Sequence, residues 1–123
     1  MNATRRLSVM VFILVGLSLV LIGCQDSFIT SGFRSLVISK AQYTATMETL
    51  GDLYKSGVIG DEEKAKAVKY GTMYMEAHNQ AVAALADYAI LETDETKDKY
   101  LRMASLVSTR LMSLLEFSEK YLQ

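Results

Sequence analysis

The chain has 123 residues, of which 50% are hydrophobic and 22% charged, and it contains one cysteine, one histidine and no proline or tryptophan. This length allows a single small domain. The formal net charge is −1 at pH 7, and because phosphate binding needs a concentrated basic surface, a nucleic-acid partner is not expected. His78 is the only imidazole, so the sequence offers no three-histidine metal site. We predict no catalytic residues, no metal, no cofactor and no enzymatic activity.

Residues 1–23 have the organisation of an export signal, because Arg5 and Arg6 are followed by an uncharged apolar run from Leu7 to Ile22. The run ends in Leu21-Ile22-Gly23-Cys24, which resembles the lipobox of bacterial lipoproteins. In that family the cysteine thiol receives a diacylglycerol, the signal is cut before the cysteine, and the new amino group is usually acylated too. The resemblance implies that Cys24 is the lipid attachment site and that its acyl chains hold the protein on a membrane.

Two other interpretations of this segment remain open. An uncleaved transmembrane anchor is one, although the apolar run is at the short end of what spans a hydrocarbon core of ~30 Å. Export through the twin-arginine route is the other. Gln25 follows the cysteine, where enteric lipoproteins retained in the inner membrane have aspartate, so the resemblance implies an outer-membrane anchor that faces the periplasm. The inner membrane and the cell surface are the alternatives.

The rest of the chain is predicted to be all-α, with a lipidated tether over residues 24–33 and an antiparallel three-helix bundle over residues 34–123. Absence of proline and scarcity of glycine favour helix. A first helix is expected over about 34–55, because apolar side chains recur there at helical spacing. They are Leu36, Tyr43, Met47, Leu50 and Tyr54, and Lys40 falls in the same register and weakens the start of this stripe. Gly57 fits a left-handed helix end, with Val58 as the apolar contact that follows it.

The second helix is expected over about 61–91, with Asp61 as N-cap, and the third over about 94–122, with Thr93 as N-cap. The second helix carries two adjacent apolar seams. One comprises Val68, Thr72, Met75, Asn79, Val82, Ala86 and Ala89; the other comprises Ala67, Gly71, Tyr74, His78, Ala81, Leu85 and Tyr88. The third helix has a heptad-like seam of Tyr100, Ala104, Val107, Leu111, Leu114, Ser118 and Tyr121.

A first helix of about 22 residues is too short to cover two helices of about 30 residues, and exposed apolar surface usually marks a partner. We therefore expect an uncovered surface near the connection between the second and third helices, unless Phe28, Ile29 and Phe33 extend the first helix or a second chain packs there. Its candidate residues are Ala86, Ala89, Ile90, Leu91, Tyr100 and Leu101. This pattern favours an envelope accessory protein that binds another envelope protein or a second copy of itself.

A second interpretation is a periplasmic bundle that binds a small ligand or a metal around Met75, His78 and Asn79, since thioether and imidazole ligands suit Cu(I). Methionine on an apolar seam is usually core filling, which favours the structural interpretation. A third interpretation rests on a loose similarity in size and layout to small phage-borne or mobile-element lipoproteins, and it implies a role in exclusion or lysis.

Overall fold

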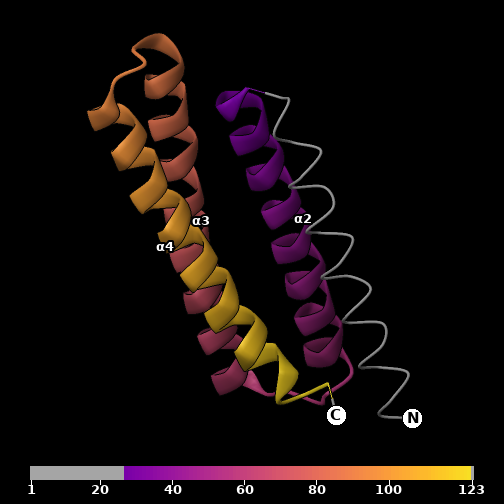
Figure 1. Ribbon diagram of the computed structural model, residues 1–123. Helices are drawn as coiled ribbons and strands as arrows, with labels where there is room; N and C mark the ends of the chain where they lie inside the picture. Colours follow the sequence, from indigo (N-terminus) through magenta and orange to yellow (C-terminus); the bar gives the residue numbers. More distant parts are fainter. Residues whose placement is uncertain (1–26, 123) are drawn as a thin grey trace, which may run out of the picture. The chain divides into compact units, whose positions relative to one another are not determined.

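The computed structural model describes residues 27–122, and within that range it consists of three helices joined by short turns (Figure 1). They are α2 (Phe28–Lys55), α3 (Asp61–Ile90) and α4 (Asp94–Glu119). The prediction of an all-α three-helix bundle is confirmed.

The first helix begins six residues earlier than the pattern predicted, at Phe28 instead of residue 34. Ser27 explains the start, because its Oγ accepts a hydrogen bond of 3.2 Å from the backbone N–H of Thr30. This is the N-cap geometry that satisfies an orphan donor of the first turn. The tether expected over residues 24–33 is therefore helical from Phe28 onward.

The turn between α2 and α3 is a Schellman motif centred on Gly57, whose φ of 80° lies in the left-handed region. The backbone N–H of Val58 donates to Leu53 O at 2.9 Å, and that of Gly57 donates to Tyr54 O at 3.1 Å. Gly57 thus acts as predicted, and the buried apolar side chain of this turn is that of Ile59. Val58 is exposed, and the neighbouring Ile59 is buried in the core instead.

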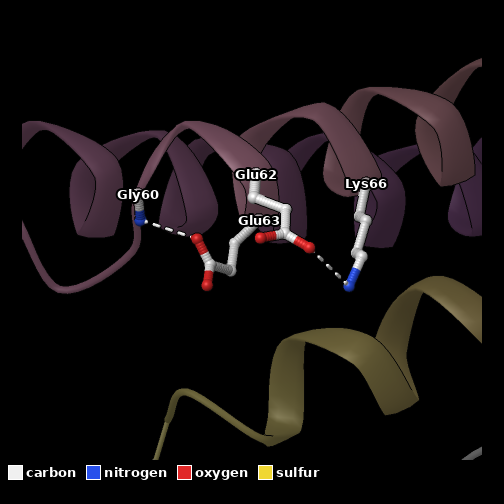
Figure 2. A network of polar contacts seen from close by, with 4 residues as sticks. All are labelled: Gly60, Glu62, Glu63 and Lys66. Atoms are coloured by element: carbon white, nitrogen blue, oxygen red, sulfur yellow. Dashed lines mark hydrogen bonds and ion pairs between the residues drawn. The ribbon is translucent and has the colours of Figure 1, made fainter.

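The sequence predicts Asp61 as the N-cap of α3. In the structure the N-cap is Gly60, and the Glu63 side chain bonds to its backbone (Figure 2). The Gly60 N–H donates to Glu63 Oε2 at 3.0 Å, so the glutamate reaches back over the first turn. Asp61 is the first helical residue, and its carboxylate accepts a hydrogen bond of 2.7 Å from the Tyr54 hydroxyl. Figure 2 also shows the ion pair of 3.7 Å between Glu62 and Lys66.

The N-terminus of α4 is capped by Thr93, as predicted. Thr93 Oγ1 accepts from the Thr96 N–H at 3.2 Å, and Thr96 Oγ1 accepts in return from the Thr93 N–H at 3.2 Å. This reciprocal pair is a capping box in which threonine takes the place usually held by glutamate or glutamine. Two orphan donors are satisfied, so the chain breaks cleanly between α3 and α4 without glycine or proline.

The predicted seam of α4 and one of the two predicted seams of α3 form the core. On α3, the buried seam is the one that contains Gly71, Tyr74 and Leu85, whereas Val68 on the other seam is half-exposed. On α4, five of the seven seam residues are buried: Tyr100, Val107, Leu111, Leu114 and Ser118. The single polar member of these five, Ser118, satisfies its hydroxyl by donating to Leu115 O at 2.8 Å.

Contacts between α2 and α3 run in antiparallel order. A Cβ placed on Gly32 would lie 2.8 Å from Leu85, and one placed on Gly71 would lie 3.1 Å from Met47. Low residue numbers on α2 therefore meet high numbers on α3. The closest backbone approach is between α3 and α4, whose Cα atoms come within 8 Å of one another along their interface. Longer side chains such as Met47 bridge the wider spacing to α2.

Candidate functional site

A groove of about 450 Å³ lies between α2 and α3, and we call it the α2–α3 groove. Its walls are mainly apolar and include Phe33, Leu36 and Val37 from α2 and Val82 from α3. Pockets that bind small molecules commonly measure ~300–1,000 Å³ and combine apolar walls with a few polar groups. The α2–α3 groove has a volume in this range and mainly apolar walls, but it is open to solvent and not enclosed.

Three polar side chains contribute to the groove, namely Lys40, Thr44 and His78. Lys40 is exposed on α2, and the residues that line the groove include no carboxylate. Among residues 27–122, no ion pair holds the Lys40 ammonium group. The groove therefore presents a cation without a compensating anion.

His78 is the buried polar group of the groove, with only 7% of its surface exposed. Its Nδ1 atom is buried and has no hydrogen-bond partner within the part of the chain that the structure describes. A buried polar atom left unpaired costs about 1–3 kcal/mol. The neighbouring Tyr74 ring lies 5.9 Å away, centroid to centroid, and is tilted by 35°. This contact packs the imidazole without satisfying its nitrogen.

Tyr74 anchors the wall beside His78. It is fully buried, stacks on Tyr43 with ring centroids 4.6 Å apart, and shares a hydrogen bond of 2.7 Å with the Ser39 hydroxyl. Burial raises the pKa of Tyr74 above its usual value of 10.0, and the hydrogen bond with Ser39 acts in the opposite direction. The two rings join α2 to α3 and thereby fix the position of His78.

The predicted grouping of Met75, His78 and Asn79 is only partly brought together. His78 lines the groove, but Met75 is half-buried beside it on the helix and Asn79 is exposed, and neither lines the groove. Over residues 27–122, no cluster of three or more histidine, cysteine, aspartate or glutamate residues is placed to hold a metal ion. The groove residues on α2 were missed, although Lys40 on the apolar stripe of α2 was a signal in the sequence.

The candidate interface near the connection between α3 and α4 needs correction in two respects. The argument from unequal helix lengths is wrong, because the first helix extends through Phe28, Ile29 and Phe33, which was the alternative to an uncovered surface. The three helices are of similar length: α2 has 28 residues, α3 has 30 and α4 has 26. The prediction that Tyr100 is exposed is also wrong, because only 5% of its surface is exposed. Its hydroxyl oxygen would lie 3.0 Å from a Cβ placed on Gly32. The early start of α2 brings Gly32 to this end of the bundle and covers Tyr100.

The other candidate residues do lie at the surface. Ile90 is 85% exposed, Leu91 is 62% exposed and Leu101 is 46% exposed. Ala86 and Ala89 are exposed as well. Ile90 is the last residue of α3, Leu91 follows it in the connection, and Leu101 lies in the second turn of α4. We call these three exposed aliphatic residues the α3–α4 end patch.

Cys24 and the run from Leu7 to Ile22 lie outside the described residues. None of the helices within residues 27–122 has the length and apolar character needed to cross a bilayer. Comparisons with models of known protein families, with curated proteins and with solved structures found no match.

Proposed function

We propose that this protein is a lipid-anchored interaction protein of the bacterial envelope. Acyl chains on Cys24 hold it in the outer membrane on the periplasmic side, and the α3–α4 end patch binds another envelope protein or a second copy of the chain. The observation that carries the proposal is the exposure of Ile90, Leu91 and Leu101 at one end of the bundle. Contiguous exposed apolar residues mark interaction surfaces, and we infer such a surface from the position of these three residues at the same end of α3 and α4.

The position of this patch agrees with an anchor at Cys24. Gly32 packs against the side chains of Leu85 and Tyr100. It follows Cys24 by only eight residues in the sequence. An acylated Cys24 would therefore hold the α3–α4 end of the bundle close to the membrane surface. Two or three acyl chains give a stable attachment where one chain gives only a marginal one. A partner that lies in or on the same membrane is then within reach of the patch.

Lipidation is tested by growing cells with an alkyne fatty-acid analogue and detecting the tag on the protein. The wild type is expected to be tagged, and Cys24→Ala is expected to be untagged. A tag that persists on Cys24→Ala would contradict acylation at this residue. Cys24→Ala should also leave the membrane fraction if the signal is not retained as an anchor.

The interaction surface is tested by chemical crosslinking in membranes. Ile90→Lys places a charge in the α3–α4 end patch and is expected to remove the crosslinked product. Val58→Lys is the matched control, because Val58 is an exposed valine in the turn between α2 and α3, at the other end of the helices. Equal crosslinking of wild type and Ile90→Lys would contradict the proposed surface. A product lost in both variants would show that the patch is not the specific site.

A further inference from the structure

The α3–α4 end patch is bordered by acidic residues. Residues 87–98 contain five carboxylates and one basic residue, Lys97. The five acidic residues are all exposed, and they are Asp87, Glu92, Asp94, Glu95 and Asp98. We propose that the patch binds a basic amphipathic segment of another protein, whose aliphatic side chains cover the patch while its lysines and arginines meet the carboxylates. This inference rests on the proposed function, because it specifies the partner of the same surface.

The spacing along each helix places the carboxylates beside the aliphatic residues. Asp87 precedes Ile90 by three positions on α3, and Asp98 precedes Leu101 by three positions on α4. Residues three apart are neighbours on a helix surface. Leu91, in the connection, is followed directly by a glutamate. A partner that covers the patch therefore also approaches these charges.

The fold itself does not neutralise this border. Within residues 27–122, none of the five carboxylates takes part in an ion pair. Lys99 and Arg102 are exposed on α4, and neither of them forms an ion pair with a described residue. The charges of the border are thus open to groups supplied by a partner.

Two of the carboxylates are placed where helix stability does not account for them. Asp94 and Glu95 lie in the first turn of α4, where the helix dipole favours negative charge. Asp87 lies in the last turn of α3 and Glu92 lies just beyond that helix, where the dipole disfavours negative charge. The last turn of α3 has no basic residue to offset them. Cations on a partner would relieve this repulsion.

Charge also decides between the possible occupants of the patch. In a two-fold contact between copies of the chain, the same surface meets itself. The carboxylates of one copy would then oppose those of the other, and like charges in contact disfavour association. A membrane surface with anionic head groups is repelled for the same reason. A basic amphipathic segment matches both the apolar patch and its border, and complementary charge also speeds the encounter.

Photolabelling of the full chain in phosphatidylcholine nanodiscs tests the inference. The probe is a short helical peptide with leucines and a photoreactive group on one face and lysines on the other. Labelled segments are identified by mass spectrometry, and labels are expected on the segment that contains Ile90 and Leu91. A matched peptide with glutamate in place of lysine should leave that segment unlabelled. Equal labelling of it by both peptides would overturn the inference.

Charge-neutral variants locate the contact. The double variant Asp87→Asn, Glu92→Gln is expected to raise the lysine-peptide concentration for half-maximal labelling by about fivefold, as the loss of two exposed charge pairs predicts. Added salt should weaken labelling of the wild type more than that of this variant. The matched control is Glu116→Gln, Glu119→Gln, which removes two exposed carboxylates at the opposite end of α4. Equal weakening in both double variants would overturn the inference.

The crosslinking test of Ile90→Lys separates this inference from the proposed function. A crosslinked product that Ile90→Lys removes, together with equal labelling by the lysine and glutamate peptides, would leave the proposed function standing and overturn the basic partner alone. A product that consists of two copies of the chain joined at the patch would do the same. Equal crosslinking of wild type and Ile90→Lys would contradict the proposed function and the inference with it.

Discussion

The hydroxyl oxygens of Ser39 and Tyr74 lie 2.7 Å apart and share a hydrogen bond that joins α2 to α3. Tyr74 is fully buried and Ser39 is half-buried, so this bond is formed largely away from water. It stands beside the stacked rings of Tyr43 and Tyr74. Removing one hydroxyl leaves the other without its partner, whereas removing both leaves no polar group to satisfy.

A double-mutant cycle is expected to show coupling between these two residues. Ser39→Ala should lower the free energy of unfolding by about 1–3 kcal/mol, because it strands the buried Tyr74 hydroxyl. Tyr74→Phe should cost about 1 kcal/mol, and the double variant should lose less than the sum of the two single variants. Urea unfolding followed by circular dichroism measures these values. Strictly additive losses would show that the hydrogen bond is energetically unimportant.

Alkaline pH is expected to weaken the bundle. Burial raises the pKa of both Tyr74 and Tyr100 above 10.0 in the folded protein. Between pH 10.0 and the folded-state values, the unfolded chain releases these protons first, so it binds fewer protons than the folded chain and stability falls as pH rises. The contribution is fully present below pH 10.0. Urea unfolding at a series of pH values should therefore show a smaller alkaline loss for the Tyr74→Phe, Tyr100→Phe double variant than for the wild type.

The fold was predictable where local signals and apolar spacing agreed. The α4 seam, the Thr93 cap and the left-handed Gly57 all follow from residue types whose local effect is strong. The start of α2 was predicted too late, at residue 34, although an extension through Phe28, Ile29 and Phe33 was the alternative. The sequence did not decide between the two, because the N-cap role of Ser27 depends on the hydrogen bond that its Oγ accepts from the Thr30 N–H. That one cap changed the helix length and with it the inference about the uncovered surface.

The groove was less predictable because it depends on how two helices meet. His78 and Lys40 were both noticeable in the sequence, one as the single histidine and the other as a charge on an apolar stripe. Nothing in their spacing places them in one groove, since they lie on different helices. Met75 and Asn79 are close to His78 in the sequence, yet they do not line the groove. Closeness to His78 in the sequence therefore did not predict which residues line the groove.

Two glycines are expected to respond in opposite ways to alanine. Gly51 lies within α2, and nothing is within 4 Å of where its Cβ would stand. Gly51→Ala should therefore raise the free energy of unfolding by about 0.5–1 kcal/mol through helix propensity. Gly57 is also unobstructed, but its φ of 80° strains any residue with a Cβ. Gly57→Ala should lower stability by about 1–2 kcal/mol, and equal effects in thermal unfolding would contradict this assignment.

Truncation of Leu114 is expected to open a cavity in the core. The side chain is fully buried and belongs to a cluster with Leu50, Ile59 and Phe117. Leu114→Ala should lower the free energy of unfolding by about 2–5 kcal/mol. Met112→Ala is the control on the same helix, because Met112 is 57% exposed, and it should change stability by less than about 0.5 kcal/mol. Similar losses in both variants would contradict the assignment of Leu114, and not Met112, to the core.

Replacement of His78 is expected to stabilise the protein, since it removes a buried nitrogen that has no partner within residues 27–122. His78→Leu keeps an apolar side chain of comparable size against Tyr74 and should raise the free energy of unfolding by about 1 kcal/mol. The measurement is urea unfolding of the wild type and the variant. A variant that is less stable than the wild type would show that the imidazole serves the packing of the bundle.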